Sequence, residues 1–384
     1  MTKEVTRHIN PTVERVLWAK AGGRCQFKGC NRLLYHSAVT LEAVNISEKA
    51  HIYSFSEDGP RGWSDILRRK PDQLNNIDNL MLMCHDCHKT IDQDKDGSKY
   101  SADLLRGWKT EHELRIKIVT GIDPKNKTHV VFYGANIGDQ KSPLQKDETY
   151  QAIFPHRYPA EENPIMLSMS SSHKDKDEPY WGTEQQHLQR IFQQRIEHRI
   201  EENSPAHFTV FALAPMPLLI QLGALFTDKI SVDVRQPIRE PKTWEWQAEP
   251  ELFHFIVTEP TTNHKNPVLI MSLTAKIDHS RVTAIMGEDI DIWEIATEAA
   301  DQHNDFIRAA NQLSLFRQEM RKLIGKISSH AGNSTPLHVF PAMPVSCSIE
   351  MGRIRMPKAD MPWVIYDQNN TAGKFITSLV IQEQ

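Results

Sequence analysis

Four cysteines near the N-terminus have the residue type and the spacing of a metal site. Cys25 and Cys30 stand in GRCQFKGCNR, and Cys84 and Cys87 stand in MLMCHDCHKT. A C-x4-C pair followed by a C-x2-C pair is typical of tetrahedral zinc bound by four thiolates, although a C-x2-C pair alone also serves redox chemistry. Zinc with four thiolate ligands has no open coordination position, so we expect this Zn2+ to stabilise a small fold rather than to catalyse a reaction.

A second pattern of polar residues surrounds the cysteines. His51 lies between the two pairs in KAHIYSF, and Asn79, His88 and Asp92 follow it. The string A-H-I, then N-x4-C-x2-C-H, then an aspartate four residues on, resembles the HNH endonuclease family over about residues 20–95. The resemblance implies a fold of two strands and a helix around a metal ion (ββα-metal). It also implies that His51 is the general base, that Asn79 orients the base and holds its strand, and that His88 binds the catalytic cation.

Phosphodiester hydrolysis explains why these residue types are needed. A neutral imidazole such as that of His51 can accept a proton from water near pH 7. One Mg2+ or Mn2+ ion can act as a Lewis acid on the phosphate and on the leaving oxygen. His88 and Asp92 are i and i+4 on an expected helix, so both side chains can point at one such ion.

Ala50 departs from the pattern of many HNH enzymes, in which the residue before the base is an Asp or His that binds the metal. The catalytic cation is therefore expected to rest on His88, Asp92 and water. Glu48 or an asparagine of the segment LNNIDN (74–79) are further candidates for its ligands.

Composition places the chain among soluble multidomain proteins. It has 384 residues with a net charge of −4, and it shows neither a signal peptide nor an apolar run long enough to span a membrane. Only five cysteines are present, four of them in metal spacing, which favours a cytoplasmic location. Residues 1–122 carry 19 Lys and Arg against 16 Asp and Glu, whereas residues 123–384 carry an excess of seven acidic residues. A basic cluster, Arg61 with 68–70, indicates either a polyanionic partner for the first part or a solvated loop.

The polar segment GIDPKNKT (121–128) marks the expected boundary between two domains, 1–122 and 123–384. Beyond it, buried-strand patterns alternate with helical ones, as in HFTVFALAP followed by MPLLIQLGALFTD. PVLIMSLTA followed by 292–327, and LHVFPAMPVSCSIEMGRI near the end, repeat the pattern. This alternation predicts an α/β domain with a largely parallel sheet.

The second domain resembles the SAVED family, a sensor of two fused CARF-like, Rossmann-type halves. The resemblance rests on a strand ending in Ala-Pro, a helix containing Leu-Gly, and the W-x-W of TWEWQ. On a strand, Trp244 and Trp246 would share one face, where they could stack on bases. The alternative for each tryptophan is packing in the core. Phosphate groups of a ligand would need cations or backbone N–H groups near the turns. The candidate ligand-binding residues are Pro215, Arg235, Trp244, Trp246, Lys276, Pro341 and Arg353.

An HNH domain joined to a SAVED domain is similar to the HNH–SAVED effectors of CBASS anti-phage systems. The resemblance implies a cyclic di- or trinucleotide activator, such as a cyclic GMP-AMP, made by a partner nucleotidyltransferase. It also implies ligand-driven assembly to a homotetramer and degradation of double-stranded DNA.

Two other functions remain open at this stage. The chain could be a restriction-type HNH endonuclease whose second domain reads modified DNA, although the acidic charge of that domain disfavours extensive DNA contact. It could also be a zinc-knuckle DNA-binding regulator without catalytic activity, which would have no use for His51, Asn79 and His88 together.

Overall fold

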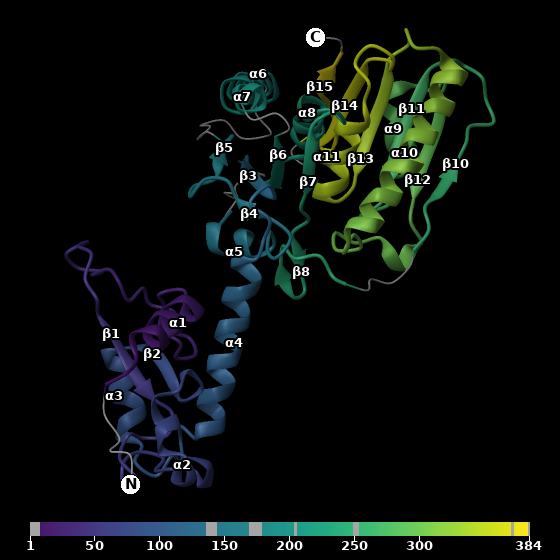
Figure 1. Ribbon diagram of the computed structural model, residues 1–384. Coiled ribbons are helices and arrows are strands. Elements are labelled where there is room, and N and C mark those ends of the chain that lie inside the picture. Colours follow the sequence, from purple (N-terminus) through teal and green to yellow (C-terminus); the bar gives the residue numbers. More distant parts are fainter. Residues whose placement is uncertain are drawn as a thin grey trace. The chain divides into compact units, whose positions relative to one another are not determined.

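The computed structural model describes residues 8–135, 144–168, 179–202, 206–248, 253–369 and 372–382 (Figure 1). The chain divides into two compact units, Met1–Asp123 and Pro124–Gln384. No helix in the described part of the chain is both long and apolar enough to cross a membrane.

The first unit is built on two antiparallel strands followed directly by a helix. Strand β1 (Ser47–His51) pairs with β2 (Leu80–Cys84) so that His51 lies opposite Leu80. Helix α3 (His85–Gln93) begins at the residue after β2. The remaining elements of the unit are α1 (Pro11–Ala21), α2 (Asp65–Arg69), the 3-10 helices η1 (Pro71–Asn75) and η2 (Ile77–Asn79), and α4 (Ala102–Thr120).

Local capping explains where the helices of this unit begin and end. The side chain of Asn10 accepts a hydrogen bond from the backbone N–H of Thr12 at 2.8 Å, Pro11 occupies the first helical position, and Gly22 ends α1 in the left-handed conformation. Ser101 caps α4 in the same way by accepting from the N–H of Leu104. The core of the unit gathers around the fully buried β2 and around α1.

The second unit contains two sheets. The first has the order β4-β3-β6-β7 with all pairs parallel, and β5 also pairs with β3. The second has the order β10-β12-β11-β13-β14-β15, parallel through its centre and antiparallel at both edges. The strands of the first sheet are β3 (Lys127–Gly134), β4 (Tyr158–Pro159), β5 (Ile165–Met166), β6 (His207–Leu213) and β7 (Ser231–Val234). Those of the second are β10 (Ile256–Thr258), β11 (Pro267–Ser272), β12 (Asp291–Ala296), β13 (Leu337–Ala342), β14 (Trp363–Asn369) and β15 (Lys374–Ile381).

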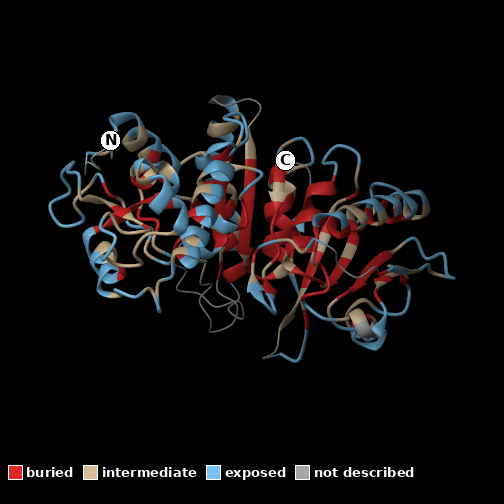
Figure 2. Cartoon of the chain, turned by 60° about the horizontal axis from the view of Figure 1, so that its bottom comes forward, coloured by how far each residue is buried: buried red, intermediate tan, exposed pale blue. Residues whose placement is uncertain are grey.

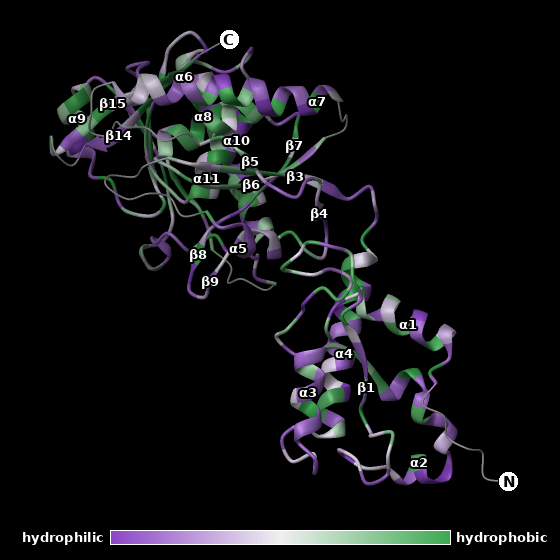
Figure 3. Ribbon diagram, turned by 90° about the vertical axis from the view of Figure 1, so that its left-hand side faces the viewer, coloured by the Kyte–Doolittle hydropathy of each residue, from purple (hydrophilic) through white to green (hydrophobic). Residues whose placement is uncertain are grey.

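Helices and short strands complete this unit. They are α5 (Lys146–Gln151), α6 (Tyr180–Phe192), a π-helical turn (Gln193–Glu197), α7 (His198–Glu202), α8 (Met216–Phe226), β8 (Ile238–Arg239), β9 (Lys242–Thr243), α9 (His279–Met286), η4 (Ala299–Asp301), α10 (Ala310–Ala331) and α11 (Val345–Ile354). Figures 2 and 3 show that buried and hydrophobic residues coincide along the central strands of the unit, as expected for parallel strands covered on both faces.

Helix α8 follows β6 of the first sheet, α11 follows β13 of the second, and the two helices cross at close range. Each begins after a proline N-cap, Pro215 or Pro344, and each carries a glycine eight residues later, Gly223 or Gly352. A Cβ atom on Gly223 would lie 1.9 Å from the carbonyl oxygen of Ile349, and one on Gly352 would lie 1.9 Å from that of Ile220. Only glycine permits this backbone contact, and residues of both sheets and both helices belong to one hydrophobic core.

One predicted helix is partly wrong. The sequence pattern suggested a single helix after β11 that covers 292–327, but Asp291–Ala296 forms strand β12 beside β11, and α10 begins only at Ala310. Alternate residues of β12, among them Trp293 and Ile295, are buried. This period of two is that of a strand with one face on the core.

Candidate functional site

The four cysteines converge as their spacing predicts. Their Sγ atoms all lie within 4.8 Å of one another, and those of Cys30 and Cys84 are 3.9 Å apart. Four sulfur atoms at 2.3 Å from one zinc ion would be separated by roughly 3.8 Å in a regular tetrahedron. Among the described residues this is the only group of three or more His, Cys, Asp or Glu side chains close enough to hold a metal ion.

The electrostatics of the cluster also fit a bound cation. Burial, with the negative charge of the neighbouring sulfurs, raises the pKa of Cys25 to about 12. The same causes raise the pKa of Cys87 still further. Four thiolates this close repel one another, and a divalent cation would offset that repulsion. The donor set therefore suits structural zinc.

Asn79 holds the chain just beyond His51. It is 5% exposed, its Oδ1 accepts a hydrogen bond from the N–H of Tyr53 at 2.9 Å, and its Nδ2 donates to the carbonyl of Tyr53 at 3.0 Å. Nδ2 also donates to the carbonyl of Leu74 at 3.0 Å. In addition, the N–H of Ile52 donates to the backbone carbonyl of Asn79. The segment that carries His51 is thus tied to the start of β2 through both backbone and side chain.

The imidazole of His51 is oriented by Asn75, a residue of the LNNIDN segment. Nε2 of His51 lies 2.9 Å from Oδ1 of Asn75, whose Nδ2 donates to the carbonyl of His8 at 3.3 Å. Since the amide N of Asn75 faces a carbonyl, its oxygen faces the ring, and Nε2 of neutral His51 must be the protonated nitrogen. The lone pair of the ring then lies on Nδ1.

His88 and Asp92 lie together on α3, as their spacing predicts. Nε2 of His88 is 3.2 Å from Oδ2 of Asp92. Two ligand atoms at about 2.1 Å from one cation and at right angles to each other are roughly 3.0 Å apart, so this pair could share an ion. Desolvation disfavours ionised Asp92, but the hydrogen bonds and charges of His88 and Arg61 outweigh it and hold the pKa of this carboxyl below its usual value.

The residue before His51 and the further candidates for cation ligands have other surroundings. Ala50 is fully buried in the core of the first unit. Glu48 approaches Nδ1 of His85 at 3.5 Å, and both side chains are largely exposed. Asn75 contacts His51, Asn76 accepts from the N–H of Asp78, and Asn79 bonds the backbone of Tyr53. Glu48 and the three asparagines of LNNIDN, the candidates for additional cation ligands, therefore all have other partners.

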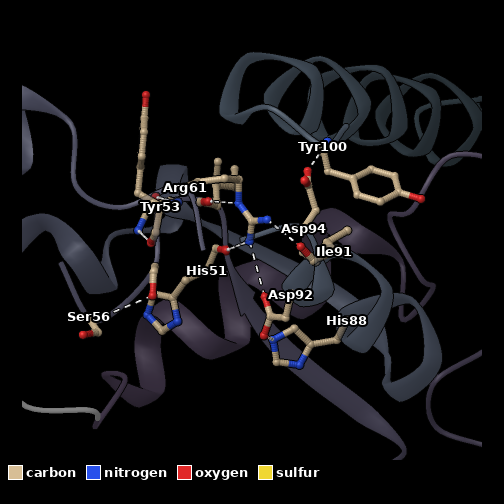
Figure 4. Close-up of polar contacts among 12 residues, drawn as sticks. His51, Tyr53, Ser56, Arg61, His88, Ile91, Asp92, Asp94 and Tyr100 are labelled. Carbon is tan, nitrogen blue, oxygen red and sulfur yellow. Dashed lines mark hydrogen bonds and ion pairs between the residues drawn. The ribbon is translucent and has the colours of Figure 1, made fainter. Parts of the chain in front are cut away.

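Arg61 is a site residue that sequence reasoning misassigned. The basic cluster suggested an exposed side chain, on a solvated loop or facing a polyanion, but the side chain of Arg61 is only 2% exposed. Figure 4 shows its guanidinium between His51 and Asp92, where it donates to the backbone carbonyl of His51 and to the carboxylate of Asp92. The sequence holds no local signal for this position, because the contacts come from segments 9 to 31 residues away.

The two tryptophans do not share one face of a strand, and Trp244 packs in the core, the alternative given for each of them. Trp244 and Trp246 follow β9 rather than lying on a strand, and they pack into different clusters. Trp244 is buried against Phe211 with ring centroids 5.2 Å apart. Trp246 is half-buried, and Cζ of the Arg235 guanidinium lies over its ring, 6.0 Å from the ring centroid.

Arg353 is a structural residue. Its Nη1 pairs with the buried Glu350 at 2.8 Å, and its other donors bond the carbonyls of Thr227 and Ile230. These partners surround the start of β7, whereas Arg235 follows the end of that strand. Arg353 is therefore at the opposite end of the sheet from the ligand site that the turns predicted.

The other candidates lie at or after the carboxyl ends of parallel strands. Pro215 is the N-cap of α8 after β6, and Lys276 is exposed after β11. Pro341 is buried within β13, so the turn comes two residues later than predicted. Arg235 is 8% exposed, burial lowers its pKa, and its Nε has no hydrogen-bond partner in the described part of the chain.

Comparison with protein families accounts for both units. The model of the SAVED family, described as the SMODS-associated and fused to various effectors sensor domain, matches residues 186–381, about half of the chain. The chain belongs to the SAVED family. An HNH endonuclease model matches residues 25–95, a range that contains the four cysteines, His51, Asn79, His88 and Asp92. The protein is thus an HNH–SAVED chain, and the α/β class and two-part architecture predicted from sequence are confirmed.

Solved structures similar to this chain are Cap4 SAVED/CARF-domain containing receptors. The receptor of Acinetobacter baumannii with the cyclic trinucleotide 2'3'3'-cAAA is 12% identical, with a TM-score of 0.39, and covers 77% of this chain. That of Moraxella osloensis is 10% identical, with a TM-score of 0.36 and 81% coverage. The chain spans 66% and 68% of the length of these two receptors. The comparison with curated proteins finds no match.

Proposed function

We propose that this HNH–SAVED protein is a DNA endonuclease that becomes active when its SAVED domain binds a cyclic oligonucleotide. The observation that carries the proposal is the oriented His51, which lies at the end of β1 and is linked through Arg61 to the His88–Asp92 pair on α3. A purely structural zinc module has no need of this arrangement.

The geometry supports a defined proton path. Water attacks phosphorus, a new P–O bond forms, the P–O3′ bond breaks, and Nδ1 of His51 accepts the proton of the attacking water. Asn75 keeps Nε2 protonated and the ring in place, while Asn79 holds the strand end. Solvent supplies a proton to the leaving O3′. His88 and Asp92 would hold Mg2+ or Mn2+, which when bound provides Lewis-acid stabilisation of the phosphate and of the leaving oxygen.

Assembly would explain how one such site cuts double-stranded DNA. A single ββα-metal site cleaves one strand, so a double-strand break calls for two sites that act together. A ligand that binds the assembled form more tightly than the separate chains shifts the equilibrium toward assembly. We therefore propose a ligand-bound homotetramer that acts in the cytoplasm as a CBASS effector in anti-phage defence, with a partner nucleotidyltransferase as the source of the activator.

The ligand site is proposed at the carboxyl ends of the parallel strands. Arg235 and the half-buried Trp246 supply a cation and an aromatic face there, and Lys276 supplies a second cation. A cyclic di- or trinucleotide needs both kinds of group for its phosphates and bases.

The test is a panel of cyclic di- and trinucleotides added to full-length protein with plasmid DNA and Mg2+. We expect degradation with a subset of the panel, little without ligand, and none by His51→Ala, which should still assemble with ligand. Constitutive cutting of methylated DNA without any ligand would instead support a modification-dependent restriction enzyme. DNA binding without cutting under all conditions would support a regulator.

A further inference from the structure

The guanidinium of Arg61 joins two segments that backbone pairing does not connect. Its Nε donates to the carbonyl of Ile52 at 2.6 Å and Nη2 donates to that of His51 at 3.3 Å. On the other side, Nη1 donates to the carbonyl of Ile91 at 2.7 Å and Nη2 to Oδ1 of Asp92 at 3.4 Å (Figure 4). One planar group thus spans the end of β1 and the last turn of α3.

These acceptors lie where the two regular elements end. The last carbonyls of a helix have no intrahelical donor, and a cation near that end also interacts favourably with the helix dipole. Ile91 and Asp92 lie in the last turn of α3, which ends at Gln93. His51 is the last residue of β1, and Ile52 lies just beyond it. Arg61 therefore satisfies acceptors at both element ends at once.

The arginine is itself held in place at its backbone and along its stem. Its φ of 64° is left-handed, and its N–H donates to the carbonyl of Lys95 at 3.1 Å. A Cβ atom on Gly97 would lie 2.9 Å from Cγ of Arg61, so the glycine leaves the space through which the stem passes. Burial disfavours the charged guanidinium and lowers its pKa, while Asp92 opposes that shift.

Burying a guanidinium is costly even when it is paired, and a well-packed apolar residue of similar size is often as stabilising. Stability alone therefore gives a weak reason for an arginine here. Its planar fork can bond several acceptors at fixed angles, which neither an apolar residue nor a lysine can reproduce.

We propose that Arg61 is a positioning residue that fixes the strand end bearing His51 relative to the turn bearing Asp92. It orients the carboxylate of Asp92 through Oδ1 and leaves Oδ2 beside His88. This inference rests on the proposed nuclease function, and it names the residue that aligns His51 with the His88–Asp92 pair.

The alternative is that Arg61 contacts DNA as part of the basic cluster. Arg68 provides the matched control, because it belongs to the same cluster but is 56% exposed and pairs with Glu57 and Asp65. A DNA contact would weaken substrate binding, whereas a positioning residue changes turnover and the binding of Mn2+.

The experiment compares Arg61→Lys, Arg61→Met and Arg68→Lys in the full-length protein. For both Arg61 variants we expect kcat to fall on the order of 10- to 100-fold at saturating Mn2+, with KM for DNA changed less than twofold. Binding of Mn2+ alone, followed by electron paramagnetic resonance, should weaken about tenfold. Lysine should restore less than half of the lost rate, and Arg68→Lys should resemble the wild type in kcat and Mn2+ affinity. Wild-type kcat and Mn2+ affinity in Arg61→Lys, or a change confined to KM, would overturn the proposal.

A second variant covers the case in which the Arg61 substitutions do not fold. Gly97→Ala leaves the arginine in place but forces its stem to move, and it should lower kcat and Mn2+ affinity in the same direction. Hydrogen exchange gives a readout that does not need nuclease activity: the segments 51–54 and 88–93 should lose protection together in Gly97→Ala. If the wild type cuts no DNA with any ligand, the proposed function fails. Unchanged exchange and Mn2+ binding would refute the role of Arg61 separately.

Discussion

Removal of the Asn79 side chain should release the strand end that carries His51. Asn79 makes three side-chain hydrogen bonds, two with the backbone of Tyr53 and one with the carbonyl of Leu74, and it is almost completely buried. At about 1 kcal/mol for each bond, Asn79→Ala should destabilise this region by about 3 kcal/mol. That free energy corresponds to roughly a 100-fold change in an equilibrium constant.

Native-state hydrogen exchange measured by mass spectrometry can test this magnitude locally. Peptides that cover 47–54 should exchange roughly 100-fold faster in Asn79→Ala, since opening of the strand becomes about 3 kcal/mol easier. Asn76→Ala is the matched control, because Asn76 makes a single long capping bond of 3.4 Å with the N–H of Asp78 in the same segment. It should change exchange by no more than roughly fivefold. Equal exchange rates in the two variants would refute the view that Asn79 clamps the strand.

Three further predictions concern the metal cluster and the second unit. Cys84→Ser should lower the zinc content and solubility of the purified protein, since the cluster would lose one of its four thiolates; a soluble, active variant without zinc would contradict the structural role. Gly352→Ala should lower the thermal midpoint by several degrees because its Cβ would meet the carbonyl of Ile220 at 1.9 Å, whereas Gly325→Ala, with no atom within 4 Å, should leave it unchanged or raise it; shifts of the same sign would argue against the close helix crossing. Burial opposes ionisation of Asp291, but bonds from the N–H groups of His264 and Lys265, from Thr262 and from His330 outweigh it and lower its pKa to about 2. A carboxyl group whose pKa is lower in the folded than in the unfolded protein stabilises the fold at pH values above the unfolded-state pKa. This stabilisation is lost as the pH falls through the folded-state pKa, so the wild type should lose about 2 kcal/mol of unfolding free energy between about pH 4 and pH 2. Denaturant unfolding of Asp291→Asn across that range should show a smaller loss, and parallel curves would refute the assignment.

Local patterns predicted much of the first unit. The helical pattern of PTVERVLWAKA in α1, the serine before α4, the apolar run LMLMC of β2 and the spacing within each cysteine pair are all local features of the chain. Capping, helical periodicity and knuckle spacing act over a few residues, so the sequence shows them directly. The His88–Asp92 pair follows from the same logic, because helical geometry alone places i and i+4 together.

The sequence was less informative wherever a contact depends on two distant surfaces meeting. The spacing of Leu104, Leu105, Trp108 and Leu114 suggests one apolar face of α4, yet Leu104 and Leu114 are exposed while Leu105 is buried. Trp244 and Trp246 could share a face only on a strand, and the chain instead turns after β9. Periodicity gives the relative direction of neighbouring side chains, but it does not predict which face of a helix or strand packs against the rest of the protein.

The four-cysteine pattern and the HNH-like string were therefore determined by the sequence alone, because residue type and short spacing define both. The orientation of the imidazole of His51 was decided by tertiary structure. Asn75 reaches His51 across 24 residues, and Arg61 reaches Asp92 across 31. Such contacts depend on how the segment between β1 and β2 folds over the end of β1 and the last turn of α3, and short-range sequence patterns do not predict that arrangement. The crossing of α8 and α11 at Gly223 and Gly352 has the same origin, since each glycine gains its meaning only when the backbone of the other helix lies against it.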